Sequence, residues 1–169
     1  DLAVPATGIA EAVFARGLSG QAELRAEAQK QDFEGPSGVV PMAEEDKVAF
    51  INDIREALYA SKIVAYAQGF NEITEAAKVY DWKIDLAAVA RIGRGGCIIR
   101  AKFLNRISDA FENGEANVSL LFAPYFKDAI ETAERSWRRV VSRAITFGIP
   151  VPVFASSLEY FDGLRSPRL

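Results

Sequence analysis

The stretch EEDKVAFINDIREALYASKIVAYAQGFNEITEAAKVY, Glu44 to Tyr80, decides the fold because it predicts one unusually long helix. It contains no proline and only one glycine, the two residues that most disfavour a helix interior. The acidic residues at its start, Glu44 to Asp46, suit a helix N-terminus, where carboxylates meet unpaired backbone N–H groups. We therefore predict a central helix that runs through most of this stretch.

Apolar side chains form two stripes along this helix. The first stripe is Ile51, Ile54, Leu58 and Ala65, and the second is Ile63, Ala67, Phe70 and Ile73. A helix that is apolar on two sides must be packed on two sides. The pattern predicts a helix placed inside a larger all-α assembly, or one shared with a partner subunit.

The segments on either side of the central helix also have helical patterns. From Thr7 onward apolar residues recur at helical spacing, and strong helix formers continue to Gln31, before proline and glycine interrupt the pattern at Glu34 to Gly38. Further helices are predicted over 85–92, 97–114, Pro124 to about Phe147 and 153–165, with breaks at 93–96 and 149–152. We predict one all-α domain over residues 1–169.

Composition limits the classes of function. Half of the 169 residues are hydrophobic, which is enough for a sizeable core, yet no run of about 18 apolar residues would span a membrane. The net charge of -3 gives no general attraction to nucleic acid or anionic membranes. The start lacks the pattern of a signal peptide and one cysteine forms no internal disulfide, so we expect a cytoplasmic protein.

The absence of histidine is the most restrictive feature. It removes histidine-assisted hydrolysis and histidine-ligated zinc, and leaves acid–base chemistry to Asp, Glu, Lys or Tyr. Carboxylate pairs such as Glu72 and Glu75 have ordinary helix-surface spacing. We find no complete catalytic constellation, no cofactor motif and no metal-ligating set in this chain.

Two arginine-rich segments are candidate sites. In RIGRGGCIIR, Arg91 to Arg100, the double glycine could hold a phosphate on its N–H groups, but it lacks the P-loop lysine and the spacing of a dinucleotide fingerprint. We interpret it as a turn between helices, with Cys97 in a packing role. In SWRRVVSR, Ser136 to Arg143, we expect the tryptophan to pack inward beneath a solvated basic face.

Arg16 lies among apolar residues of GIAEAVFAR, residues 8–16. An arginine so close to Phe14 and Leu18 is expected near a boundary of the apolar face. From the residues alone, a surface or ion-paired arginine is the favoured interpretation.

Several segments together resemble the helical domain of the decarboxylating 6-phosphogluconate dehydrogenase family. The segments are GIAEAVFAR, DIREALYASKIVAYAQGF, RGGCIIR, AKFLNRISDAF, LLFAPYF, SWRRVVSRAITFGIPVPVF and YFDGLRSPRL, in this order. The resemblance covers nearly the whole chain and is weakest over residues 21–40. Gly93 departs from it, because the family usually has a tryptophan before the residue matched by Arg94.

The resemblance implies a piece of an enzyme that oxidises 6-phosphogluconate with NADP and decarboxylates the product to ribulose 5-phosphate. It implies that Arg16 binds the substrate phosphate, since a guanidinium offers a planar fork of donors to a phosphate. It further implies a homodimer whose core this chain supplies, with NADP and the catalytic lysine and glutamate held outside these residues. The isolated piece is then expected to be inactive.

Two alternatives remain open at this point. The chain could be a stand-alone helical module for dimerisation or regulation, which the two-sided helix would also serve. It could also belong to another branch of the 3-hydroxyacid dehydrogenases, which RGGCIIR and GIPVPVF disfavour.

Overall fold

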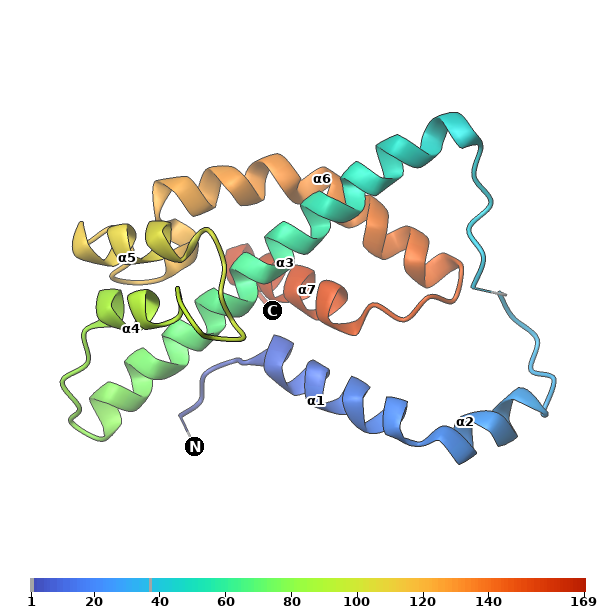
Figure 1. Cartoon of the computed structure of the whole chain (residues 1–169), viewed down its shortest axis with the longest axis horizontal. Helices are drawn as coiled ribbons and strands as arrows, with labels where there is room; N and C mark the ends of the chain where they lie inside the picture. Colours follow the sequence, from blue (N-terminus) through green and yellow to red (C-terminus); the bar gives the residue numbers. More distant parts are fainter. Residues whose placement is uncertain (1, 37) are drawn as a thin grey trace. The chain divides into compact units, whose positions relative to one another are not determined.

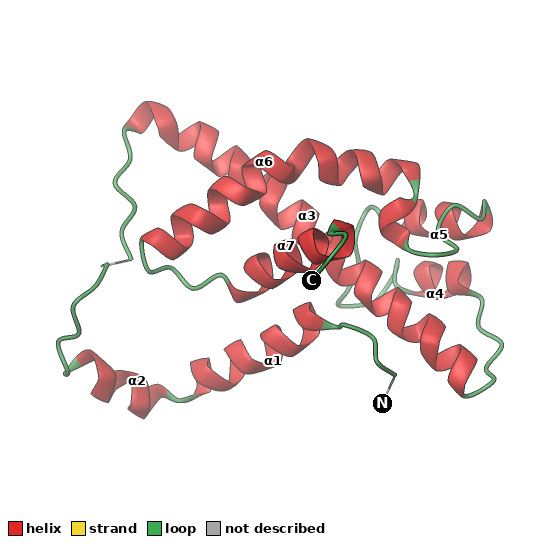
Figure 2. Cartoon of the chain, turned by 180° about the vertical axis from the view of Figure 1, so that it is seen from behind, coloured by secondary structure: helices red, strands yellow, loops and turns green. Residues whose placement is uncertain are grey.

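The computed structural model describes residues 2–36 and 38–169, and within them all regular structure is helical (Figures 1 and 2). The α-helices are α1 Thr7–Gly20, α2 Ala22–Gln29, α3 Glu44–Val79, α4 Leu86–Ile92, α5 Leu104–Glu112, α6 Pro124–Thr146 and α7 Pro152–Arg165. A short 3-10 helix, Leu120–Phe122, precedes α6. The all-α prediction and the long helix are confirmed. None of these helices is both long and apolar enough to cross a bilayer.

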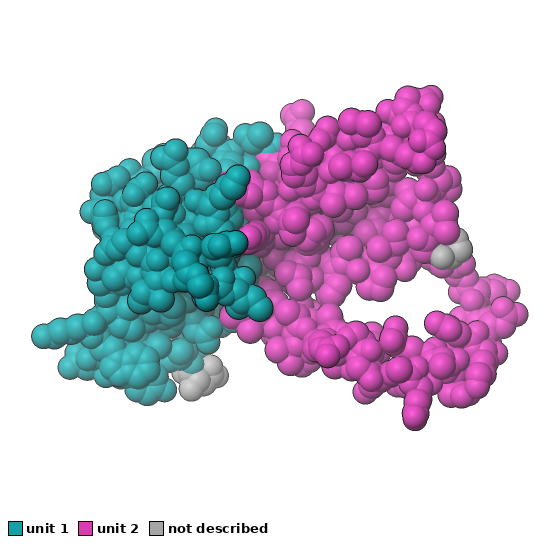
Figure 3. All heavy atoms as spheres, viewed as in Figure 1, with its two compact units in different colours: residues 1–6, 63–132 teal, residues 7–62, 133–169 magenta. Residues whose placement is uncertain are grey.

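The chain forms two compact units, shown in different colours in Figure 3. The first holds the described residues of 1–6 and 63–132, and the second holds those of 7–62 and 133–169. Helices α3 and α6 each contribute one part to each unit. Each unit has its own buried residues and is described separately below.

The first unit is built around aromatic contacts. Phe70 on α3 lies 5.0 Å from Phe111 on α5, and Phe103 lies 5.1 Å from Tyr66 and 6.2 Å from Phe126, measured between ring centroids. Helix α4 packs against α5. These contacts bury the second predicted stripe of α3 at Ile63, Ala67 and Phe70.

The second unit is centred on Trp137 of α6, which is fully buried as predicted. Its indole N–H donates to the carbonyl oxygen of Phe154 at 3.0 Å, and its ring lies 6.4 Å from that of Phe161 on α7. Helix α1 packs along α7 in the same unit. The buried indole therefore joins α6 to α7 while its only polar atom keeps a hydrogen bond.

Proline and glycine set the ends of α6 as predicted, whereas α7 begins one residue earlier than the predicted range of 153–165. Pro124 begins α6, and Gly148 follows its end with a φ of +72°, a conformation that costs glycine little. A Cβ at Gly148 would also lie 2.9 Å from Cγ of Pro36, so only glycine fits against that segment. Pro152 begins α7.

The first predicted stripe of α3 has a different outcome from the second. Ile51 is 57% exposed and Leu58 is 54% exposed, although this part of α3 is tied to α6 through Asp53. The described chain therefore leaves Ile51 and Leu58 of the first stripe exposed. Packing within the chain buries the second stripe of α3 but not the first.

The helix predicted over 97–114 begins later than expected, at Leu104. Gly96 has a φ of +67°, and successive turns follow, in which Arg100 N–H bonds to Cys97 O and Leu104 N–H bonds to Ala101 O. Residues 97–103 do not extend α5 toward its N-terminus. Ile98 and Ile99 are exposed, so a helix over these residues gains no stability from burying them. Ile98 is fully exposed and Cys97 is half-buried, so the expected packing of this run does not occur within the chain.

Candidate functional site

The predicted phosphate contact, Arg16, lies on the exposed surface of α1. Its Nη1 donates to the hydroxyl of Ser19 at 3.3 Å, and that hydroxyl donates to the backbone carbonyl of Arg16 at 3.0 Å. Among the described residues, no carboxylate lies within ion-pair distance of this guanidinium. Arg16 is thus a surface arginine whose charge is available to an anion.

A second arginine reaches the same serine. Arg25 of α2 donates from Nη2 to the carbonyl oxygen of Ser19 at 3.2 Å. This carbonyl belongs to the last turn of α1, where carbonyls lack partners within the helix and a positive charge is favourable. We call Arg16, Ser19 and Arg25 the α1–α2 corner.

Ser19 and Arg25 also line a cavity of about 830 Å³. Its walls are mainly apolar and come from α1, the end of α6, the segment between α6 and α7, and the start of α7. Glu11 is its acidic member. Arg16 does not line this cavity. The guanidinium of Arg16 is therefore presented beside the cavity and not into it.

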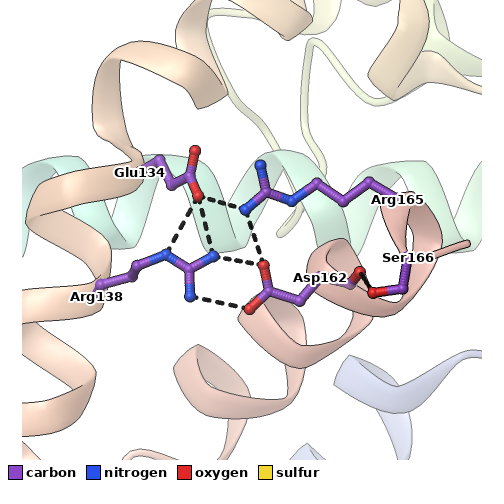
Figure 4. Close-up of polar contacts among 5 residues, drawn as sticks. All are labelled: Glu134, Arg138, Asp162, Arg165 and Ser166. Carbon is purple, nitrogen blue, oxygen red and sulfur yellow. Dashed lines mark hydrogen bonds and ion pairs between the residues drawn. The ribbon is translucent and has the colours of Figure 1, made fainter. Parts of the chain in front are cut away.

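The arginines after Trp137 are exposed, as predicted for a solvated basic face, but Arg138 and Arg139 are also ion-paired with carboxylates. Arg138 donates to the carboxylate of Glu134 at 2.9 Å and to that of Asp162 on α7 at 3.0 Å (Figure 4). Arg165 donates to the same two carboxylates, at 2.5 Å to Glu134 and at 3.1 Å to Asp162. The hydroxyl of Ser166 donates to the backbone carbonyl of Asp162. We call Glu134, Arg138, Asp162 and Arg165 the α6–α7 network.

The α6–α7 network shifts the acid–base properties of its carboxyl groups. Hydrogen bonding from Arg138 lowers the pKa of Asp162 below its usual value. Burial pushes the pKa of Glu134 upward, but hydrogen bonds from Arg138 and Arg165 outweigh it, so this pKa is also lowered. Both carboxylates stay ionised at neutral pH, and the network is suited to holding α7 on α6 and not to proton transfer.

The segment Arg91–Arg100 is a turn, as predicted, held by contacts within the chain. Arg94 donates to the side-chain oxygen of Asn105 at 2.7 Å, and Arg91 donates to Ser108 at 3.0 Å and pairs with Glu112. The hydroxyl of Tyr66 donates to the carbonyl of Ile99. With Arg94 engaged by Asn105, the double glycine is not part of an assembled phosphate cradle.

Gly93 shows how the chain accommodates its departure from the family pattern. A Cβ at this position would lie 3.2 Å from Cδ1 of Leu104 and 3.6 Å from Cδ1 of Ile99. These two side chains occupy the space into which a larger residue at this position would extend.

Metal binding finds no support in the described part of the chain, where no three His, Cys, Asp or Glu side chains gather closely enough to hold an ion.

Comparison with known proteins identifies the family. The family model described as "6-phosphogluconate dehydrogenase, C-terminal domain" matches residues 1–169. The chain belongs to this family. Its helices therefore correspond to the C-terminal domain of decarboxylating 6-phosphogluconate dehydrogenase.

Individual relatives agree with the family assignment. The chain is 47% identical to the decarboxylating 6-phosphogluconate dehydrogenase of Candida albicans over 100% of this chain, and 45% identical to that of Ovis aries over 98%. A solved 6-phosphogluconate dehydrogenase structure from Plasmodium falciparum, described in apo form and in complex with NADP+ and with 6-phosphogluconate, matches with a TM-score of 0.90 at 37% identity over 98% of the chain.

The chain spans only about a third of these relatives, namely 32% of the Candida albicans protein, 34% of the Ovis aries protein and 35% of the Plasmodium falciparum chain.

Sequence reasoning singled out Arg16 but missed the rest of the α1–α2 corner. The spacing of Arg16 and Ser19 places both on neighbouring positions of one helix face, a signal that could have been used. Arg25 gave no such signal, because its approach to Ser19 depends on the change of chain direction between α1 and α2.

Proposed function

We propose that the protein containing this chain oxidises 6-phosphogluconate with NADP and decarboxylates the product to ribulose 5-phosphate. The observation that carries the proposal is the exposed guanidinium of Arg16, which has no acidic partner in the described chain. The family resemblance matches this arginine to a residue that binds the substrate phosphate. The identity of 45–47% to decarboxylating relatives over nearly all of the chain supports it.

In this function Arg16 binds the substrate and takes no part in bond breaking. Its planar fork of N–H groups matches the oxygens of a phosphate dianion. The hydroxyl of Ser19 steadies the guanidinium through the 3.3 Å hydrogen bond. NADP, held by residues outside this chain, would supply the hydride acceptor, and the acid–base groups would also lie outside it.

The proposal includes a homodimer. The exposed stripe of Ile51, Ile54 and Leu58 on α3 leaves an apolar helix face that water disfavours and that a second copy would cover. We further propose that residues 1–169 act as one domain of a cytoplasmic enzyme and that this domain alone is inactive.

Steady-state kinetics of the complete enzyme test the role of Arg16. We expect Arg16→Ala to raise KM for 6-phosphogluconate about ten- to a hundredfold, because a hydrogen-bonded charge pair with the phosphate is lost. Arg135→Ala, which removes an exposed arginine of α6, is the matched control and should leave KM unchanged. An unaltered KM in Arg16→Ala would remove the basis of the proposal.

A further inference from the structure

The α1–α2 corner brings together two positive charges that form no ion pair with a carboxylate of the described chain. Arg16 donates to the hydroxyl of Ser19 and Arg25 donates to its backbone carbonyl, so both guanidinium groups bond to the same residue. Arg91, Arg138, Arg139 and Arg165 pair with carboxylates, whereas other exposed arginines of the described chain, such as Arg55 and Arg135, do not. What distinguishes the corner is that two such arginines bond to the same serine. Two like charges bonded to one residue favour an anion near them, because its attraction offsets their mutual repulsion.

The break between α1 and α2 creates this arrangement. In one continuous helix, residues six apart would differ by about 9 Å along the axis and about 120° around it, so Arg25 would point away from Ser19. Helix α1 instead ends at Gly20, and α2 begins at Ala22 after Gln21, whose φ and ψ of -84° and 62° are not helical. The side chain of Arg25 then reaches back to the last turn of α1.

Nearby acidic side chains leave Arg25 unpaired. Glu27, two residues further along α2, pairs with Lys30 at 2.6 Å. Glu11 lines the same cavity as Arg25, but the two do not form an ion pair in the described structure. Arg25 therefore has no carboxylate partner in the described structure, and only the carbonyl end of α1 offsets part of its charge.

We propose that Arg25 is a second phosphate-recognition residue, whose charge adds to that of Arg16 in binding a phosphate monoester. The proposal rests on the proposed role of Arg16 in binding 6-phosphogluconate. A phosphate monoester carries a charge of about -1.5 to -2 at pH 7, which two guanidinium groups match better than one. Arg25 acts through its charge, and its hydrogen bond to Ser19 fixes where that charge lies.

Substitutions at Arg25 in the complete enzyme separate its charge from its hydrogen bond. Arg25→Gln keeps N–H donors for the carbonyl of Ser19 but removes the charge, and Arg25→Lys keeps the charge. We expect Arg25→Gln to raise KM for 6-phosphogluconate about threefold at low ionic strength with little change in kcat, and Arg25→Lys to stay near the wild-type value. The effect should shrink above about 0.1 M salt, where the screening length is about 10 Å.

Inhibition by gluconate, which lacks the phosphate, distinguishes recognition from damage to the fold. Its inhibition constant should be the same in wild type, Arg16→Ala and Arg25→Gln, because neither arginine would contact it. Arg135→Gln is the matched control for the loss of an exposed arginine. If Arg25→Gln weakened gluconate and 6-phosphogluconate equally, its effect would be structural and the proposal would be overturned.

The outcome for Arg16 separates the two proposals. A raised KM in Arg16→Ala together with an unchanged KM in Arg25→Gln would overturn the role of Arg25 and leave the proposed function intact. An unchanged KM in Arg16→Ala would overturn both. A raised KM in both variants, with gluconate inhibition unaffected, is the result that supports both.

Discussion

The α6–α7 network and the α1–α2 corner use arginine in opposite ways within one unit. In the network, Arg138 and Arg165 alternate with Glu134 and Asp162, so each charge is satisfied internally and two helices are joined. In the corner, two arginines meet at Ser19, and the described structure holds no carboxylate for either. The comparison teaches that arginines alternating with carboxylates join two helices, whereas two arginines bonded to one serine without a carboxylate have the charge for the anion binding proposed for the corner.

The largest loss of stability is expected at Trp137, which lies on α6 with Glu134 and Arg138 of the α6–α7 network. Trp137→Ala should lower the free energy of unfolding by about 3–5 kcal/mol, because a fully buried indole and its hydrogen bond to Phe154 are lost. Urea denaturation followed by circular dichroism measures this. Trp82→Ala is the matched control, since Trp82 is 55% exposed and should cost less than about 1 kcal/mol. Equal losses in the two variants would contradict the assigned core.

Removal of the central arginine of the network should have a smaller effect. Arg138→Ala leaves Glu134 and Asp162 with only Arg165 between them, and we expect a loss of about 1 kcal/mol. The value is modest because the side chain of Arg138 is 43% exposed and water screens its charge. Thermal unfolding at pH 7 measures the loss, with Arg135→Ala as control. A stability equal to that of the control would show that the network contributes nothing measurable.

The contribution of the network should depend on pH with a defined sign. The pKa values of Asp162 and Glu134 are lowered in the folded protein, so their contribution is complete above the unfolded-state values near 4 and is lost as the pH falls through the lower, folded values. The difference in unfolding free energy between wild type and Arg138→Ala should therefore be full at pH 7 and shrink from about pH 5 downward. Urea titrations at pH 7, 5 and 3.5 test this, and a difference that grew in acid would have the wrong sign.

The smallest effect on stability is expected at the α1–α2 corner. Arg16→Ala and Arg25→Ala should each change the free energy of unfolding by less than about 0.5 kcal/mol, because both side chains are exposed and make only long hydrogen bonds to Ser19. The same denaturation assay measures this. A loss as large as that of Arg138→Ala would mean that the corner is structural like the network, which would remove the contrast between them.

Much of the local structure could be predicted because it depends on near neighbours in the chain. The absence of proline from α3, the first-turn Pro124 and the terminal Gly148 act over a few residues, and α3 and α6 were placed almost to the residue. The start of α5 was predicted too early because Ile98 and Ile99 fit the apolar pattern of a helix that begins at Cys97. Both isoleucines are exposed because no other segment of the described chain packs over them, and the neighbouring residues in the sequence do not carry this information.

The candidate site was only partly predictable for the same reason. Arg16 came from the family resemblance, and its own surroundings in the sequence favoured a plain surface arginine. The role proposed for Arg25 and the pairing of Arg138 with Asp162, 24 residues away, depend on contacts that close only when helices pack.

The sequence by itself determined that this protein is helical, where its longest helix runs, that Trp137 is buried and that the chain resembles one family. These properties follow from helix propensity, apolar periodicity and end signals, all of which act over short distances. Only the tertiary structure decided which arginines are neutralised and which are not, and which stripe of α3 is covered. Charge pairing and burial depend on distances between segments far apart in the chain, and packing alone sets those distances.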